Sequence, residues 1–205
     1  DYKVWTDEQL INSFRATLGA RPTEVDLDQG VWVFAYGSLI WNPLLNYDIK
    51  AEASIRGYSR RFCLKTVFGR GSPDNPGLVL ALDAVEDEQD IRTEGRAFHL
   101  IPDTLEEDLF LLWRREMLAG SYKPFWIKGE VAGKPTWMIS FAITRATPRY
   151  DVDQSPKDTL HMLRTGSGLL GSSLEYFRDT LECFRQEGIV CPYLEALELE
   201  LKACP

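Results

Sequence analysis

The spacing of apolar residues near the start of the chain predicts an amphipathic helix over residues 6–19. Apolar side chains repeat at helical spacing from Leu10 to Leu18 and would form one stripe. Thr6 and Gln9 have the spacing of a capping box, in which each side chain satisfies a backbone amide of the first turn. The glycine at the end of this segment allows the helix to stop there.

Apolar residues in the middle of the chain follow patterns that are typical of strands. The run from Val31 to Phe34 is apolar without alternation, which suits a strand covered on both faces. A segment dense in Gly, Pro and Asn at 69–77 predicts a loop, and an acidic loop follows residue 84. The predicted strands are 31–34, 53–67, 78–84, 94–101, 125–132 and 135–143.

Helical patterns occupy residues 103–118 and most of the C-terminal third. There the predicted helices are 157–164, 172–187 and 192–203. Most strands follow one another without an intervening helix. This order favours a closed or strongly curved mixed sheet with helices packed outside it, so we expect an α+β protein. The length of 205 residues fits one domain with a sizeable core.

The net charge and the hydropathy of the chain indicate which kinds of partner it is expected to bind. The formal net charge is −8, which argues against nucleic acid because phosphate binding needs a basic surface. No apolar run reaches the roughly 18 residues that indicate a membrane span. The acidic and polar start of the chain predicts no signal peptide. We therefore expect a cytoplasmic protein that binds neither nucleic acid nor membrane.

The cysteines and histidines offer little material for a metal site. Cysteines at positions 63, 183, 191 and 204 form no C-x-x-C pair, so zinc-ribbon and thioredoxin-type motifs are absent from the sequence. His99 and His161 lie far apart in sequence, which disfavours a histidine-based metal centre or a Ser-His triad. Reduced thiols in a cytoplasm are the simplest interpretation.

Gly166, Gly168 and Gly171 satisfy the pattern G-x-G-x-x-G that binds dinucleotides. That motif requires a strand directly before it, within a βαβ unit. A helical pattern precedes these glycines instead, and the next helix has its own capping box from Ser172 to Glu175. We therefore expect a helix–loop–helix connection and no nucleotide.

The stretch VFAYGSLIWNP, residues 33–43, interrupts an apolar strand with Tyr36-Gly37-Ser38. A glycine there permits a sharp turn and a close approach by another group. Successive amides at such a bend can form a small anion-binding nest. An ordinary turn at the end of a strand remains the alternative.

Glu116 occupies an unusual position at the end of the helix predicted for 103–118, which Asp103 is expected to cap. At about 100° per residue, Glu116 falls about 20° from Leu105, inside the apolar stripe of this helix. The neighbouring Arg114 and Arg115 are predicted to point elsewhere. Burial and the negative end of the helix dipole would both raise the carboxyl pKa, as a general base requires.

A structural role for Glu116 is also open. The side chain could fray outward at the helix end, or it could pair with an arginine such as Arg60, Arg61 or Arg70.

Six segments in their order along the chain resemble the ChaC-type, glutathione-specific γ-glutamylcyclotransferases. The resemblance extends from about residue 31 to 200, which divides the chain into an N-terminal helical extension (1–30) and a γ-glutamylcyclotransferase-like domain (31–205). Many members have arginine where this chain has Leu78. The segments are FAYGSLIWNP, RGYSRRFCL, RGSPDNPGLVLAL, EGRAFHL, LLWRREMLAGSY and GLLGSSLEYF.

The resemblance implies a small mixed β-barrel surrounded by helices, with the active site in a cavity at the barrel. It implies that Tyr36, Gly37, Ser38 and Leu39 cradle the γ-glutamyl end of glutathione and that Glu116 is the catalytic acid/base. The matched motifs make Tyr122 and Tyr176 candidates to line the cavity, although either could be a core tyrosine. The reaction that the resemblance implies is an intramolecular cyclisation of glutathione to 5-oxoproline and Cys-Gly, which would need no metal, nucleotide or other cofactor.

Two other functions stay open. A related cyclotransferase could act on other γ-glutamyl amines or amino acids, and a non-catalytic regulator could bind ligand in the same cavity.

Overall fold

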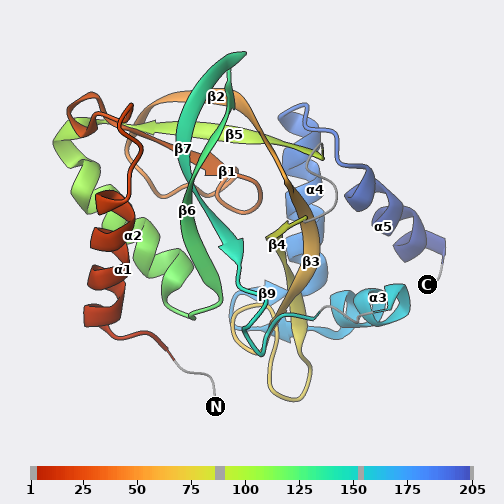
Figure 1. Cartoon of the computed structure of the whole chain (residues 1–205). Helices are drawn as coiled ribbons and strands as arrows, with labels where there is room; N and C mark the ends of the chain where they lie inside the picture. Colours follow the sequence, from red (N-terminus) through yellow and green to blue (C-terminus); the bar gives the residue numbers. More distant parts are fainter. Residues whose placement is uncertain (1–3, 86–90, 152–154, 204–205) are drawn as a thin grey trace. The chain divides into compact units, whose positions relative to one another are not determined.

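A computed structural model describes residues 4–85, 91–151 and 155–203 (Figure 1). The chain divides into two compact units, which are described separately. The first comprises Asp1–Ser59 with Ala84–Thr144, and the second comprises Arg60–Asp83 with Arg145–Pro205. Most of the predicted acidic loop lies outside the described residues. In the part of the chain that the structure describes, no helix is long and apolar enough to cross a bilayer.

The first unit is built on a closed five-stranded barrel with the strand order β1-β5-β2-β6-β7. Strands β1 and β7 pair in parallel and the other neighbours pair antiparallel, so the predicted mixed barrel is confirmed. The elements of this unit are α1 (Asp7–Gly19), η1 (Leu27–Gln29), β1 (Val31–Ala35), β2 (Tyr47–Arg56), β5 (Arg92–Leu100), η2 (Pro102–Thr104), α2 (Leu105–Met117), β6 (Tyr122–Val131) and β7 (Lys134–Ile143).

Local sequence signals account for two features of this unit. The capping box at the start of α1 is confirmed, with Thr6 and Gln9 each accepting a hydrogen bond from the other's backbone amide. The β6–β7 hairpin turns at Ala132-Gly133, whose φ angles of 47° and 77° are those of a turn that matches the strand twist.

The N-terminal helix α1 packs beside α2 (Figure 1). The ring of Phe14 lies edge-on to Trp113 of α2, with 5.4 Å between centroids. The indole of Trp126, on β6, donates to the carbonyl of Thr17 at 2.8 Å. The backbone amide of Trp5 donates to the carbonyl of Leu118 at 2.9 Å. Residues 5–17 therefore contact both α2 and the barrel.

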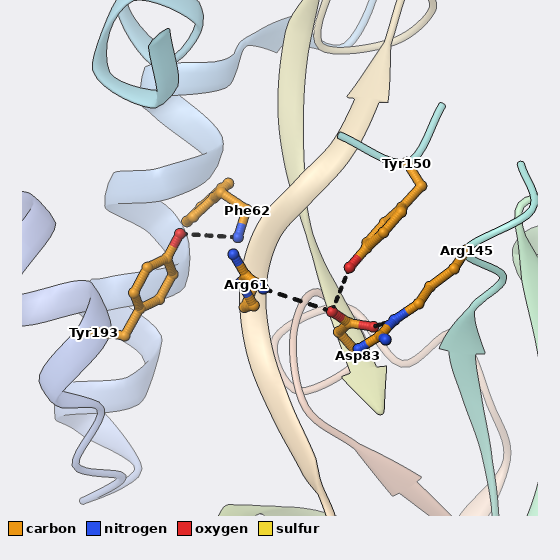
Figure 2. A network of polar contacts seen from close by, with 6 residues as sticks. All are labelled: Arg61, Phe62, Asp83, Arg145, Tyr150 and Tyr193. Atoms are coloured by element: carbon orange, nitrogen blue, oxygen red, sulfur yellow. Dashed lines mark hydrogen bonds and ion pairs between the residues drawn. The ribbon is translucent and has the colours of Figure 1, made fainter. Parts of the chain in front are cut away.

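The described part of the second unit combines two two-stranded sheets, β3–β4 and β8–β9, with three helices. Phe62 of β3 packs against the rings of Phe177 and Tyr193, and its amide donates to the Tyr193 hydroxyl at 3.1 Å (Figure 2). The elements are β3 (Tyr58–Thr66), which begins in the first unit, β4 (Gly77–Ala84), α3 (Pro156–Thr165), β8 (Ser167–Gly168), β9 (Gly171–Ser172), α4 (Ser173–Gln186) and α5 (Pro192–Ala203).

Asp83 of β4 is a buried carboxylate in this unit that the sequence pattern did not reveal. Arg145 donates to it at 3.0 Å, the Tyr150 hydroxyl donates at 2.8 Å, and an Arg61 nitrogen lies 3.7 Å away (Figure 2). The side chain of Asp83 is only 2% exposed. Two half-exposed arginines and a hydroxyl compensate the cost of burying its charge, so Asp83 can lie inside this unit.

Three details differ from the sequence predictions. The single strand predicted at 53–67 is wrong, because Gly57, with φ of 77°, separates β2 from β3. Asp103 does not cap α2, because Pro102–Thr104 form a 3-10 turn and the N-cap is Thr104. The connection from α3 to α4 holds a small hairpin, β8–β9, and the Ser172–Glu175 capping box is confirmed.

Candidate active site

The segment after β1 turns at Tyr36–Leu39. The amide of Ile40 donates to the Gly37 carbonyl and the amide of Asn42 donates to the Ser38 carbonyl, each at 2.9 Å. Within the described residues, the amides of Gly37, Ser38 and Leu39 have no hydrogen-bond acceptor. Three successive amides without an acceptor can donate to an anionic group, as the predicted nest requires.

The buried face of α2 carries the predicted apolar stripe. Leu105, Leu109, Leu112 and Trp113 are all at most 7% exposed. Glu116 belongs to the same face, and its side chain is 14% exposed. The helix continues to Met117, which is 1% exposed, so Glu116 does not fray outward.

Burial raises the pKa of the Glu116 carboxyl above its ordinary value of 4.5, and the positive charge of Arg115 acts in the opposite direction. The net shift is upward, so the cost of desolvation outweighs the attraction to the guanidinium. A carboxyl group with a raised pKa is suited to exchange protons with an amine near neutral pH.

Arg115 does not point away from Glu116, so the prediction for this residue is wrong. Its Nε atom lies 3.2 Å from Oε1 of Glu116. Its Nη2 donates to the Ser38 hydroxyl at 3.1 Å, and its Nη1 donates to the carbonyl of Asn42. A single guanidinium therefore connects the candidate base to the turn that follows β1.

The arginines that the sequence offered as partners of Glu116 lie in the second unit and have partners there. Arg60 stacks over the ring of Phe184 at 4.6 Å, and Arg61 is close to Asp83. Arg70 lies 5.7 Å from the ring of Tyr176. The arginine that pairs with Glu116 is instead its neighbour in the sequence, Arg115.

Asp108 makes a second connection between α2 and the segment after β1. It is 1% exposed and accepts hydrogen bonds from both the amide and the side chain of Asn46, each at 3.1 Å. The Thr104 hydroxyl donates to its other oxygen at 2.6 Å. Asp108 and Arg115 are two helical turns apart, so they hold the turn segment along one side of α2.

The structure brings only some of the predicted site residues together. Tyr36–Leu39 and Glu116 share the first unit and are linked through Arg115. Tyr122 is the first residue of β6 in the same unit and pairs with Ile143. Tyr176 lies on α4 in the second unit, where it is 6% exposed and meets Phe62 edge-on at 6.1 Å.

The described thiols are poorly suited to nucleophilic chemistry. Cys63, Cys183 and Cys191 are free and buried. Burial and the nearby Asp83 carboxylate raise the pKa of Cys63 to about 12, so this thiol stays protonated near neutral pH. Among the described residues, no three His, Cys, Asp or Glu side chains gather into a metal-binding cluster.

Comparison with solved structures defines the class of fold. The chain superposes on the crystal structure of the γ-glutamyl cyclotransferase specific to glutathione from yeast with a TM-score of 0.76. The match covers 85% of this chain and 96% of the yeast chain at 22% identity. The fold is therefore that of the γ-glutamyl cyclotransferases.

The chain belongs to the ChaC-like protein family, whose model matches residues 31–203. It is 37% identical over 175 residues to the glutathione-specific γ-glutamylcyclotransferase of Escherichia coli (strain K12), a match that covers 84% of this chain and 71% of that protein. It is 31% identical over 166 residues to glutathione-specific γ-glutamylcyclotransferase 1 of Danio rerio, covering 79% and 81%. These matches confirm the resemblance that the motifs indicated.

Proposed function

We propose that this chain is a glutathione-specific γ-glutamylcyclotransferase with Glu116 as its acid/base. The observation that carries the proposal is the shielded Glu116 carboxylate, tied by Arg115 to the turn at Ser38 in a chain of the ChaC-like family. The names of the relatives supply the substrate, and the geometry supplies the groups that would act on it.

The proposed reaction is an intramolecular cyclisation. The α-amine nitrogen of the γ-glutamyl group forms a bond to its own γ-carbonyl carbon, and the bond from that carbon to the cysteinyl nitrogen breaks. The products are 5-oxoproline and cysteinylglycine. The protons lost by the attacking nitrogen finish on the leaving nitrogen, so neither water nor a net proton is consumed.

Glu116 would move those protons. Its raised pKa lets the ionised form accept a proton from the substrate ammonium and the protonated form return one to the departing amine. Because nucleophile and electrophile belong to one molecule, the enzyme has chiefly to select the folded-back conformer. This scheme assigns no step to a metal or an organic cofactor.

The turn at Tyr36–Leu39 is proposed to hold the γ-glutamyl end. The amides of Gly37, Ser38 and Leu39, which have no hydrogen-bond acceptor within the described residues, could donate to a carboxylate of the substrate. Without such donors the desolvation of the carboxylate would be costly. Tyr122 and Tyr176 remain candidates to line the cavity on the strength of their motifs. We assign the reaction to residues 31–205 and treat 1–30 as an N-terminal helical extension, a division supported by the family match over 31–203.

Leu78, where the family resemblance led us to expect arginine in many members, is fully buried in β4, and its amide donates to the Ser173 hydroxyl at 3.0 Å. Its side chain therefore has a packing role. A cytoplasmic location is proposed because the described cysteines are free thiols. The net charge of −8 favours a small-molecule substrate over nucleic acid.

Product analysis tests the proposed function. Purified protein with reduced glutathione and a chelator should yield equal amounts of 5-oxoproline and cysteinylglycine, measured by chromatography. Release of free glutamate would indicate hydrolysis and contradict cyclisation, and loss of activity on chelation would contradict the cofactor-free scheme. Faster turnover of other γ-glutamyl dipeptides would favour the broader cyclotransferase, and binding without product would favour a regulator.

A further inference from the structure

We propose that Arg115 is a positioning residue that fixes the Glu116 carboxylate beside the turn at Ser38–Asn42 and favours its ionised form before substrate binds. This inference rests on the proposed function, because it concerns the same carboxylate and the same turn. The three contacts of the guanidinium carry it.

The geometry of the contacts requires an arginine. A guanidinium presents its donors in a planar fork, so one group can satisfy several acceptors at fixed angles. Here Nε faces Glu116, Nη2 donates to Ser38 and Nη1 donates to Asn42. The Arg115 side chain is 24% exposed, so most of it is shielded from water. A lysine has one compact ammonium and could not hold all three acceptors in this arrangement.

The charge of Arg115 acts on Glu116 against the effect of burial. Desolvation favours the neutral carboxyl, and the guanidinium favours the carboxylate. Two other ionisable side chains of α2 have partners of their own. Arg114 pairs with Asp7 of α1 at 3.4 Å, and Asp108 accepts from Asn46 and Thr104.

The turn segment contributes only Tyr36 as a titratable group. Strand β6 contributes Tyr122 and the exposed Lys123, while its Lys128 and Glu130 pair with Glu24 and Arg92. Arg115 is the charged side chain that acts on Glu116 against the larger effect of burial.

Two consequences separate this role from a purely structural one. Loss of the positive charge should raise the pH at which Glu116 ionises, because desolvation then acts alone. Loss of the planar fork should weaken substrate binding, because the Ser38–Asn42 turn loses both of its contacts with Arg115. Asp108 holds the far end of the segment, so the fold has an anchor that is independent of Arg115.

The experiment compares Arg115→Met, Arg115→Lys and the matched control Arg114→Met. Two quantities are measured for each protein. The first is the pH dependence of kcat and KM with glutathione. The second is the ionisation midpoint of Glu116 without substrate, followed by carbon-13 NMR of the labelled carboxyl group and assigned with Glu116→Gln. The NMR titration does not depend on turnover, so it tests Arg115 even if the proposed function fails.

Arg115→Met should move the NMR midpoint and the acidic limb of kcat/KM upward by about one pH unit or more, and should raise KM. Arg115→Lys should restore most of the midpoint and leave KM high, because charge returns without the fork. Arg114→Met should match the wild type in both.

The proposal is overturned if Arg115→Met keeps the wild-type midpoint and KM, or if Arg115→Lys either fails to restore the midpoint or restores the wild-type KM. If Arg115→Met does not fold, Arg115→Lys alone tests the proposal. A wild-type KM in Arg115→Lys would overturn the positioning role. A raised KM together with a near-wild-type ionisation midpoint of Glu116 would support it.

Discussion

Glu116 has opposing effects on stability and on chemistry. Its folded-state pKa is raised above the ordinary value of 4.5, so the folded chain holds this proton more tightly than the unfolded chain does. The contribution of Glu116 therefore favours folding below about pH 4.5 and is lost as the pH rises through the folded-state pKa. At neutral pH the ionised Glu116 side chain therefore lowers the free energy of unfolding.

Glu116→Gln should accordingly stabilise the protein at neutral pH. Each unit by which the pKa is raised corresponds to about 1.4 kcal/mol in the free energy of unfolding, or roughly 3–5 °C in Tm for a chain of this size. The gain should shrink towards zero as the pH falls to about 4.5, where the wild-type carboxyl is protonated. Thermal unfolding at several pH values measures it. The exposed Glu106→Gln serves as the control, and a gain independent of pH would contradict the prediction.

Helical periodicity was sufficient to place Glu116 on the apolar face of α2, because the direction of a Cβ atom follows from residue position. The same reasoning failed for Arg115. Its Cβ leaves the helix at another angle, and its long side chain then bends back to reach Glu116 and the Ser38–Asn42 turn. The path of a long side chain depends on acceptors far away in sequence, which a periodic pattern does not contain.

Among the elements, α1 lies outside the family match and yet supports the helix that carries Glu116. Phe14 is 5% exposed and packs edge-on against both Phe110 and Trp113 of α2. Removing this ring would leave a cavity between the two helices. We therefore expect the N-terminal helix to contribute to the stability of the first unit.

Phe14→Ala should lower the free energy of unfolding by about 3–5 kcal/mol, through lost apolar burial and the cavity left behind. Urea denaturation gives this quantity. The exposed Arg15→Ala, one residue further along α1, should change it by less than about 0.5 kcal/mol. A loss below about 1 kcal/mol for Phe14→Ala would mean that α1 contributes little to holding α2.

Strong local signals predicted element types well and boundaries less well. The capping boxes at Thr6 and Ser172 are satisfied by their own segments, so short-range reasoning found both. The break at Gly57 was missed because the run 53–67 stays partly alternating through it, and a positive φ leaves no mark on hydrophobic periodicity. The first half of β2 is exposed and carries little pattern.

At the scale of the whole molecule, a curved mixed sheet could be predicted from the succession of strands, but its closure could not. Closure depends on the parallel pairing of β1 with β7, in which Trp32 faces Met138 across more than a hundred residues of chain. The division into two units was also not visible, because each is assembled from two separate stretches of sequence. The sequence motifs were sufficient to identify the family, although the spatial arrangement of the strands and of the two units could not be derived from them.

An acidic protein that binds an anionic substrate must supply positive potential locally. The net charge is −8, so the overall field opposes glutathione, and we propose that the amides of the Gly37–Leu39 turn overcome this field at short range. Binding should therefore depend on the turn and not on the carboxylate of Glu116.

The most direct measurement compares turnover and ligand binding in Glu116→Gln. Its kcat with glutathione should fall by about 10² or more, because the variant lacks the proposed proton acceptor. Glutathione should still raise its Tm, because ligand that binds the folded state stabilises it and the turn is unchanged. Near-wild-type turnover by the folded variant would contradict the assignment of Glu116 as the acid/base.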